Sequence, residues 1–139
     1  MGTDIRPELS SKNKYWIERH RYYELKHFCL QYPLWKRAYS ELVGYHRRSG
    51  SMIDAINDIR LSDPTERYVE DRLYFSDRMK LVEQAAIGSS IELASYILKA
   101  VTEGMSYDHL KTTYNIPCGK DVYYELYRRF FWILDKTRK

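Results

Sequence analysis

Residues 104–134 of the chain read GMSYDHLKTTYNIPCGKDVYYELYRRFFWIL. Ser106 predicts the start of a helix of about two turns, because a serine side chain accepts a hydrogen bond from a backbone N–H that the helix leaves unpaired. Pro117 predicts a turn after that helix, since proline disfavours helical backbone in the residue before it. A longer, basic and aromatic helix then runs from about Gly119 to Lys136. This order of elements indicates a helix-turn-helix, whose second helix lies in the DNA major groove.

The second helix of this motif has one apolar face and one charged face. Its apolar residues recur at intervals of three and four, at Tyr123, Leu126 or Tyr127, Phe130, Ile133 and Leu134. We expect this face to pack on the first helix of the motif and on a mostly apolar helix over 91–103. The first residues of a groove-reading helix meet base edges, and residues further along meet phosphates. The predicted base-reading residues are Lys120, Asp121, Tyr124 and Arg128, and the predicted phosphate contacts are Arg129 and Lys136.

Two stretches of this region resemble a known family. Residues 116–124 (IPCGKDVYY) and 128–134 (RRFFWIL) resemble the C-terminal end of RinA/ArpU-like transcriptional regulators, which phages and prophages of Gram-positive bacteria encode. The resemblance covers roughly residues 104–136. It implies a helical protein that activates late phage genes through a helix-turn-helix similar to sigma-factor region 4. In the family's usual pattern a small hydroxyl residue precedes the basic residue that opens the recognition helix, whereas Gly119 stands there in this chain and Asp121 follows soon after.

The composition favours an all-α protein with a packed core. Hydrophobic residues make up 44% of the chain and aromatic residues 15%, while only six glycines and four prolines interrupt it. The net charge is +4, but the charges are unevenly distributed. Basic residues are in excess over 12–48 and 106–139, and acidic residues are in excess over 49–105. Two basic regions could therefore contact phosphates while the acidic middle faces elsewhere.

The chain divides by sequence into four parts. We expect a flexible arm over 1–12, a helical hairpin over 13–48, a linker over 49–62, and a helical domain over 63–139 that ends in the helix-turn-helix at 105–136.

In the hairpin, Asn13 is the expected cap of the first helix, and Pro33 should end or kink that helix near Tyr32. The second helix should run from Leu34 to about Gly44. Aromatic residues supply much of the apolar bulk of both helices.

The domain should begin with a long central helix. Ser62 or Asp63 can cap it and Pro64 suits its first position, so we expect it to reach about Ile87. Its apolar stripe suits core packing, and its length could also offer a dimer seam. Residues 88–90 (GSS) should then break the helix.

The chain carries no motif of a known catalytic centre. It has no phosphate-cradling glycine loop, nucleophile elbow or HExxH sequence, so we predict no enzyme activity and no cofactor. His20, Glu24 and His27 share a helix face, but without a further clear ligand we predict no metal site. The two cysteines have no metal-like spacing and suit small buried residues. With no signal peptide and no long apolar run, the chain suits the cytoplasm of a bacterial host, away from membranes.

These observations lead to one functional hypothesis and two alternatives. The leading hypothesis is a phage-encoded, DNA-binding transcriptional regulator, with double-stranded DNA as its partner, a host protein such as RNA polymerase as a further candidate, and a homodimer as one candidate state. The first alternative is the DNA-recognition subunit of a packaging terminase, which places a helix-turn-helix on a helical oligomerisation core. The second is a protein-interaction module that inhibits a host nuclease or defence factor.

Overall fold

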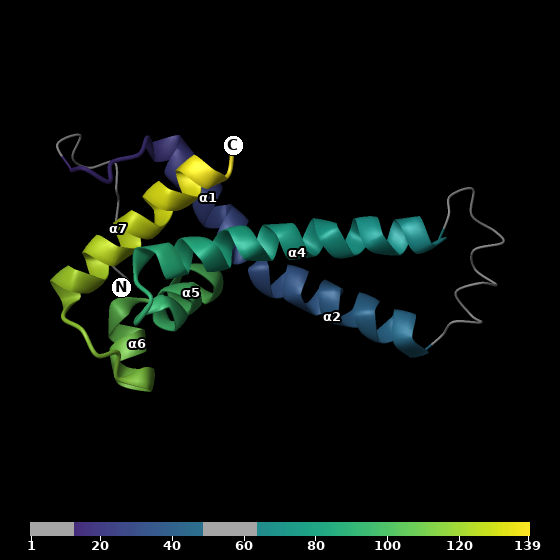
Figure 1. Ribbon diagram of the computed structural model, residues 1–139. Coiled ribbons are helices and arrows are strands. Elements are labelled where there is room, and N and C mark those ends of the chain that lie inside the picture. The colour runs from purple at the N-terminus through teal and green to yellow at the C-terminus, as the bar shows by residue number, and fades with distance from the viewer. Residues whose placement is uncertain (1–12, 49–63) are drawn as a thin grey trace. The chain divides into compact units, whose positions relative to one another are not determined.

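The computed structural model describes residues 13–48 and 64–139, and within these ranges the regular structure is entirely helical. The all-α prediction is therefore confirmed. The expectations for 1–12 and 49–62 lie outside the described residues. The helices are α1 (Arg19–Leu30), α2 (Tyr32–Arg48), α4 (Pro64–Ser89), α5 (Ala94–Glu103), α6 (Tyr107–Tyr114) and α7 (Lys120–Thr137) (Figure 1).

The chain folds into two units that differ from the divisions expected from the sequence. The first unit combines the residues up to Tyr32 with those from Leu81 onward, and the second spans Pro33–Lys80. Helix α1 packs on α5 and α7, so it belongs with the C-terminal helices, and residues 13–48 are not grouped as one hairpin. The apolar side of α1 packs on helices that lie far along the chain. The spacing of apolar residues within α1 predicts which side is buried but not which helices bury it.

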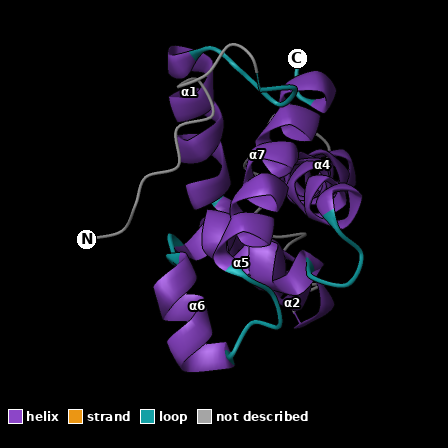
Figure 2. Ribbon diagram, turned by 90° about the vertical axis from the view of Figure 1, so that its left-hand side faces the viewer, coloured by secondary structure: helices purple, strands orange, loops and turns teal. Residues whose placement is uncertain are grey.

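The core of the first unit is an aromatic cluster between α1 and α7. Tyr22 is fully buried and its ring lies 5.1 Å from that of Phe131, which in turn lies 4.9 Å from Phe130. The hydroxyls of Tyr22 and Tyr127 are 3.0 Å apart and share a hydrogen bond, so the polar end of each ring is satisfied inside the core. The expected apolar face of α7 is confirmed, with Tyr123, Phe130 and Leu134 buried. Figure 2 shows α7 beside α1 and across α5.

The first helix begins later than Asn13. The side-chain oxygen of Asn13 accepts from the N–H of Tyr15 and makes a turn, while Glu18 caps α1 by accepting from the N–H groups of His20 and Arg21. The N–H of His20 is the larger cause that lowers the pKa of the Glu18 carboxyl, because it stabilises the charged form.

The break expected at Pro33 is present, because α1 ends at Leu30, and the next helix begins two residues before the expected Leu34. Helix α2 starts at Tyr32, so Pro33 occupies its first turn, where a proline costs no helical hydrogen bond. The expected apolar side of α2 is present in part, since Trp35 is buried while Lys36 and Arg37 are exposed.

The long helix ends at Ser89, inside the break expected over 88–90, although Gly88 itself is still helical. A Cβ atom at Gly88 would lie 3.1 Å from Cδ1 of Ile133, so the glycine allows the end of α4 to approach α7 closely. The helix that follows is shorter than expected, since α5 starts at Ala94. Ile91 is 82% exposed and so lies outside the core in which it was expected.

Helix α5 is the apolar support of the C-terminal region, as expected. Ile97 and Val101 are buried on it, and α6 and α7 both pack on it. It ends at Gly104, which adopts the left-handed conformation with φ 68°. A side chain is strained in that conformation, so glycine suits this helix end.

Candidate functional site

Helix α6 starts where its sequence predicts. The Ser106 hydroxyl oxygen accepts a hydrogen bond of 3.1 Å from the backbone N–H of His109, so the expected cap is present. Leu110 is the one fully buried residue of this helix. The other side chains of α6 are at least partly exposed, so the helix presents a mostly polar surface.

The turn between α6 and α7 is held by several specific contacts. Asn115 takes the left-handed conformation with φ 51°, and Ile116 is fully buried. The Tyr107 hydroxyl donates a 2.7 Å hydrogen bond to the carbonyl oxygen of Cys118, and the Lys111 ammonium donates to that of Ile116 at 3.3 Å. The start of α6 is thereby tied to the start of α7, which sets the direction in which α7 leaves the turn.

The side-chain contact made by Tyr107 was not anticipated from the sequence. A tyrosine at the first position of a short helix carries no local signal for a hydrogen bond to a carbonyl eleven residues later. The Tyr107 ring also lies 5.3 Å from that of Tyr123, one turn into α7. The pair of tyrosines therefore links the two helices both by ring packing and by the hydrogen bond at the turn.

Helix α7 begins at Lys120, and Gly119 makes no side-chain cap, as its lack of a side chain requires. The six residues predicted to contact DNA all lie on this helix. Four of them, Lys120, Asp121, Arg129 and Lys136, are exposed, and Tyr124 and Arg128 are half-buried.

The first turns of α7 combine a cation, an acid and an aromatic ring. The Lys120 ammonium lies 5.8 Å from the centre of the Tyr124 ring, and Tyr124 packs in turn on Tyr123. Asp121 and Glu125 are exposed one turn apart. This end of the helix therefore offers both hydrogen-bond donors and acceptors, without a strong positive field.

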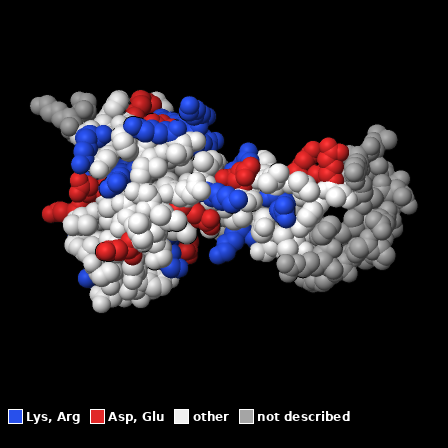
Figure 3. All heavy atoms as spheres, viewed as in Figure 1, with Lys and Arg blue, Asp and Glu red and all other residues white. Residues whose placement is uncertain are grey.

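The second half of α7 is the basic part of the helix. From residue 128 onward it carries Arg128, Arg129 and Lys136, and Asp135 is its one acidic residue. Figure 3 shows acidic side chains beside the beginning of α7 and Lys and Arg side chains along its second half. An anionic ligand is therefore attracted most strongly to the second half of the helix.

Four residues form a cation–aromatic group that we call the Trp132 stack. Trp132 and Lys136 lie on this half of α7, and Lys14 and Tyr15 lie in the segment before α1. The Lys136 ammonium lies 3.6 Å from the centre of the Trp132 ring, and the Tyr15 ring meets the same ring at 5.5 Å and 63°. The Lys14 ammonium lies 4.9 Å from the centre of the Tyr15 ring. Sequence reasoning assigned no role to Lys14 or Trp132, although the four-residue spacing of Trp132 and Lys136 on a helix was a usable signal.

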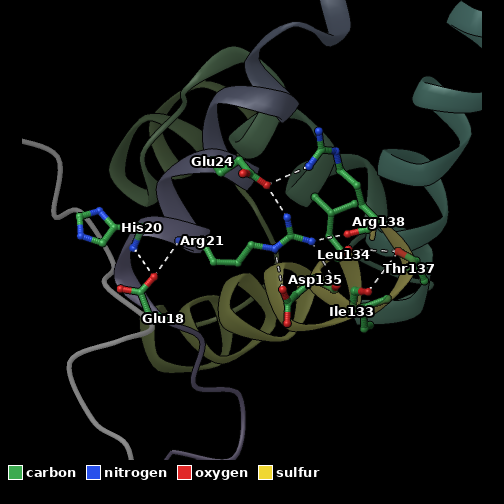
Figure 4. Close-up of polar contacts among 9 residues, drawn as sticks. All are labelled: Glu18, His20, Arg21, Glu24, Ile133, Leu134, Asp135, Thr137 and Arg138. Atoms are coloured by element: carbon green, nitrogen blue, oxygen red, sulfur yellow. Dashed lines mark hydrogen bonds and ion pairs between the residues drawn. The ribbon is translucent and has the colours of Figure 1, made fainter.

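Arg21 holds the end of α7 against α1 (Figure 4). Its Nε donates a 2.7 Å hydrogen bond to the Asp135 carboxylate, and its Nη2 donates to the backbone carbonyl of Arg138. Glu24 bridges Arg21 and Arg138, because its carboxylate accepts hydrogen bonds from both guanidinium groups. The hydrogen bond to Asp135 is the main cause that raises the pKa of the Arg21 guanidinium. The charge of Asp135 is thus paired with that of Arg21, so the exposed charged side chains on this half of α7 are positive.

Burial raises the pKa of the core phenols and of both thiols. The Tyr127 hydroxyl is buried against Tyr22, and its pKa is raised chiefly by desolvation. The pKa of the Cys29 thiol is raised by burial, and that of the half-exposed Cys118 is raised for the same reason although Lys111 opposes it. These groups stay neutral near pH 7 and serve packing.

Within residues 13–48 and 64–139, no group of three or more His, Cys, Asp or Glu could hold a metal ion. Glu24, one of the three residues considered for a metal site, is engaged by Arg21 and Arg138 instead. None of the helices in these ranges combines the length and the apolar character that a membrane span requires.

Comparisons with protein-family models, with curated proteins and with solved structures give no match.

Proposed function

We propose that this chain binds double-stranded DNA with α6 and α7 as a helix-turn-helix, and that it acts as a phage-encoded transcriptional regulator like the RinA/ArpU-like proteins that residues 104–136 resemble. The observation that carries the proposal is the α6–turn–α7 arrangement on α5. It has a capped helix of two turns, a turn tied at Cys118, and an 18-residue helix with an exposed face. A groove-reading helix needs this combination of a fixed direction and a solvent-facing surface.

The two halves of α7 suit different parts of a DNA duplex. Lys120 at its start can donate to the acceptors of guanine, and Asp121 can accept from the amino group of cytosine. Arg129 lies about two and a half turns and Lys136 about four and a half turns beyond Lys120. Both suit phosphates, which attract cations regardless of sequence. The acidic start disfavours indiscriminate binding to phosphates, and the basic second half supplies affinity. This division supports a protein that reads sequence.

The test is a binding titration with purified protein, a labelled duplex covering the DNA upstream of the gene, and a shuffled duplex of the same length. The Lys120→Ala, Arg128→Ala double variant should lose its preference for the upstream duplex by tenfold or more, since a base contact contributes ~1–3 kcal/mol of discrimination. The matched control is Lys36→Ala, Arg37→Ala, which removes the same two charges from the exposed surface of α2. Equal behaviour of the two double variants would remove α7 as the reading helix.

A second candidate function is the DNA-recognition subunit of a packaging machine. The observation that favours it lies in the second unit, where the first half of α4 exposes the apolar side chains Val69, Leu73 and Tyr74. Val69 and Leu73 are four residues apart on one helix face, as in a helix-to-helix seam. Light scattering separates the two functions, because a closed ring of many subunits supports packaging and a monomer or dimer supports regulation.

A further inference from the structure

The Trp132 stack joins a segment that precedes α1 to the basic half of α7. Residues 13–16 form a turn, in which the N–H of Trp16 donates a 3.0 Å hydrogen bond to the carbonyl of Asn13. The contact between the Tyr15 and Trp132 rings attaches this turn to α7. Lys14 and Lys136 are both exposed, and their ammonium groups lie over the two rings of that contact. Two cations from distant parts of the chain are thus brought to one surface.

The charge around the stack is predominantly positive. Arg129 is exposed on the same half of α7, one turn before Trp132. Asp135 is paired with Arg21, which takes its charge out of this surface. The acids that remain closest along the chain are Glu18, which follows the turn and accepts from two N–H groups of α1, and Glu125, which lies one turn before Arg129. A ligand with a regular row of negative charges is complementary to this arrangement.

The packing of Trp132 distinguishes between two ways of binding nucleic acid. Single strands bind by stacking their bases on aromatic rings that are open to solvent. The Trp132 ring is covered by the Lys136 ammonium at 3.6 Å, and the Tyr15 ring packs against it as well. Little of the ring is left for a base, whereas the ammonium groups stay at the surface. The stack therefore suits the phosphates of a duplex, with its rings acting as a support for the cations.

We propose that Lys14 and Lys136, supported by Tyr15 and Trp132, form a phosphate contact to duplex DNA that extends the DNA-binding surface from α7 to residues 13–16. This inference rests on the proposed function, because it assumes that α7 approaches a duplex. The inference adds residues 13–16, which lie outside the helix-turn-helix, to the proposed DNA-binding surface. The contact follows the sugar–phosphate backbone beside the groove and carries no preference for sequence.

The experiment measures the binding of a mixed-sequence duplex of about 30 base pairs as a function of salt, which counts phosphate contacts. Each lost contact lowers the slope of log affinity against log salt by about 0.9, which corresponds to roughly eightfold weaker binding at 0.1 M salt. The Lys14→Ala, Lys136→Ala variant should therefore lose about 1.8 units of slope and bind roughly sixtyfold more weakly. The Lys36→Ala, Arg37→Ala variant is the matched control and should keep the wild-type slope.

Three outcomes decide the proposal. It is supported when the Lys14, Lys136 variant binds all duplexes more weakly by one common factor and keeps its preference among them. Binding by the wild type, with no change of slope in this variant, overturns the phosphate contacts of Lys14 and Lys136 and leaves the base-reading role of the first turns of α7 intact. If the wild-type protein binds no duplex at low salt, both proposals fall. Far-UV circular dichroism of each variant confirms that the helices are retained.

A second variant tests the role of the rings. Tyr15→Ala removes the contact that attaches residues 13–16 to Trp132 and leaves the charge unchanged. Lys14→Ala should then have a smaller effect on the salt slope in the Tyr15→Ala background than in the wild type. An equal effect in both backgrounds would show that the position of Lys14 does not depend on the stack and would overturn this part of the inference.

Discussion

Replacing Arg21 with alanine should destabilise the first unit by about 2 kcal/mol. The Arg21 side chain is 26% exposed and that of its partner Asp135 is 34% exposed. A hydrogen bond to a charged group contributes ~1.5–3 kcal/mol when buried, and a fully exposed ion pair only ~0–1 kcal/mol. The partial exposure of both groups places the Asp135 pair near 1 kcal/mol, and the bonds to the carbonyls at the end of α7 add about as much.

The loss can be measured by urea and thermal unfolding. The near-UV circular dichroism of the tyrosine and phenylalanine cluster is a suitable signal, because Tyr22 and Phe131 lie in the unit that Arg21 stabilises. For a chain of this size a loss of 2 kcal/mol corresponds to a drop in Tm of roughly 6 °C. Asp135→Asn should be less harmful than Arg21→Ala, because the arginine can still bind the backbone carbonyls.

The control is an arginine in an exposed ion pair. Arg37 lies 3.6 Å from Glu41 on α2, and the two side chains are 77% and 73% exposed. Arg37→Ala should therefore change the free energy of unfolding by less than about 0.5 kcal/mol. If Arg21→Ala is no more harmful than Arg37→Ala, the attachment of α7 to α1 through Arg21 does not stabilise the fold and the reasoning is wrong.

Three further changes test the local structure. Ser106→Ala removes the cap of α6 and should cost about 1 kcal/mol in urea unfolding, so an unchanged midpoint would count against the cap. Gly88→Leu should destabilise by about 1–3 kcal/mol because a side chain there meets Ile133, and combining it with Ile133→Ala should recover part of that loss. A thiol reagent should modify Cys118 in the folded protein and Cys29 only after unfolding, because Cys29 is fully buried. The Cys118 reaction should accelerate as the pH rises towards its raised pKa, since the thiolate is the reactive form, and equal native rates for both thiols would contradict this.

Local signals predicted the C-terminal elements well. Ser106, Gly104 and Pro117 act on residues within one turn of themselves, and the helices begin and end where these residues indicate. The apolar spacing of α7 likewise predicted its buried face, because a helix places every third or fourth residue on one side. The same kind of signal misled at Asn13, whose side chain makes a turn before α1 while Glu18 caps the helix.

The candidate site was predictable only in part. The exposed positions of Lys120, Asp121, Arg129 and Lys136 follow from the periodicity of one helix. The role of Tyr107 at the turn did not follow, because its partner is a backbone carbonyl that carries no sequence signal. The neighbours of Trp132 include Tyr15, more than one hundred residues earlier in the chain, which no spacing rule connects to it.

By itself the sequence determined the helical class, the cap of α6 and the face of α7 that turns inward, since each depends on interactions within a few residues. The tertiary structure alone decided the grouping of α1 with α5 and α7, the pairing of Arg21 with Asp135, and the position of Tyr15 beside Trp132. Arg21 and Asp135 are 114 residues apart in the chain. Contacts over such separations form only where the packing of whole helices brings them together, and it is these contacts that build the charged surface along α7.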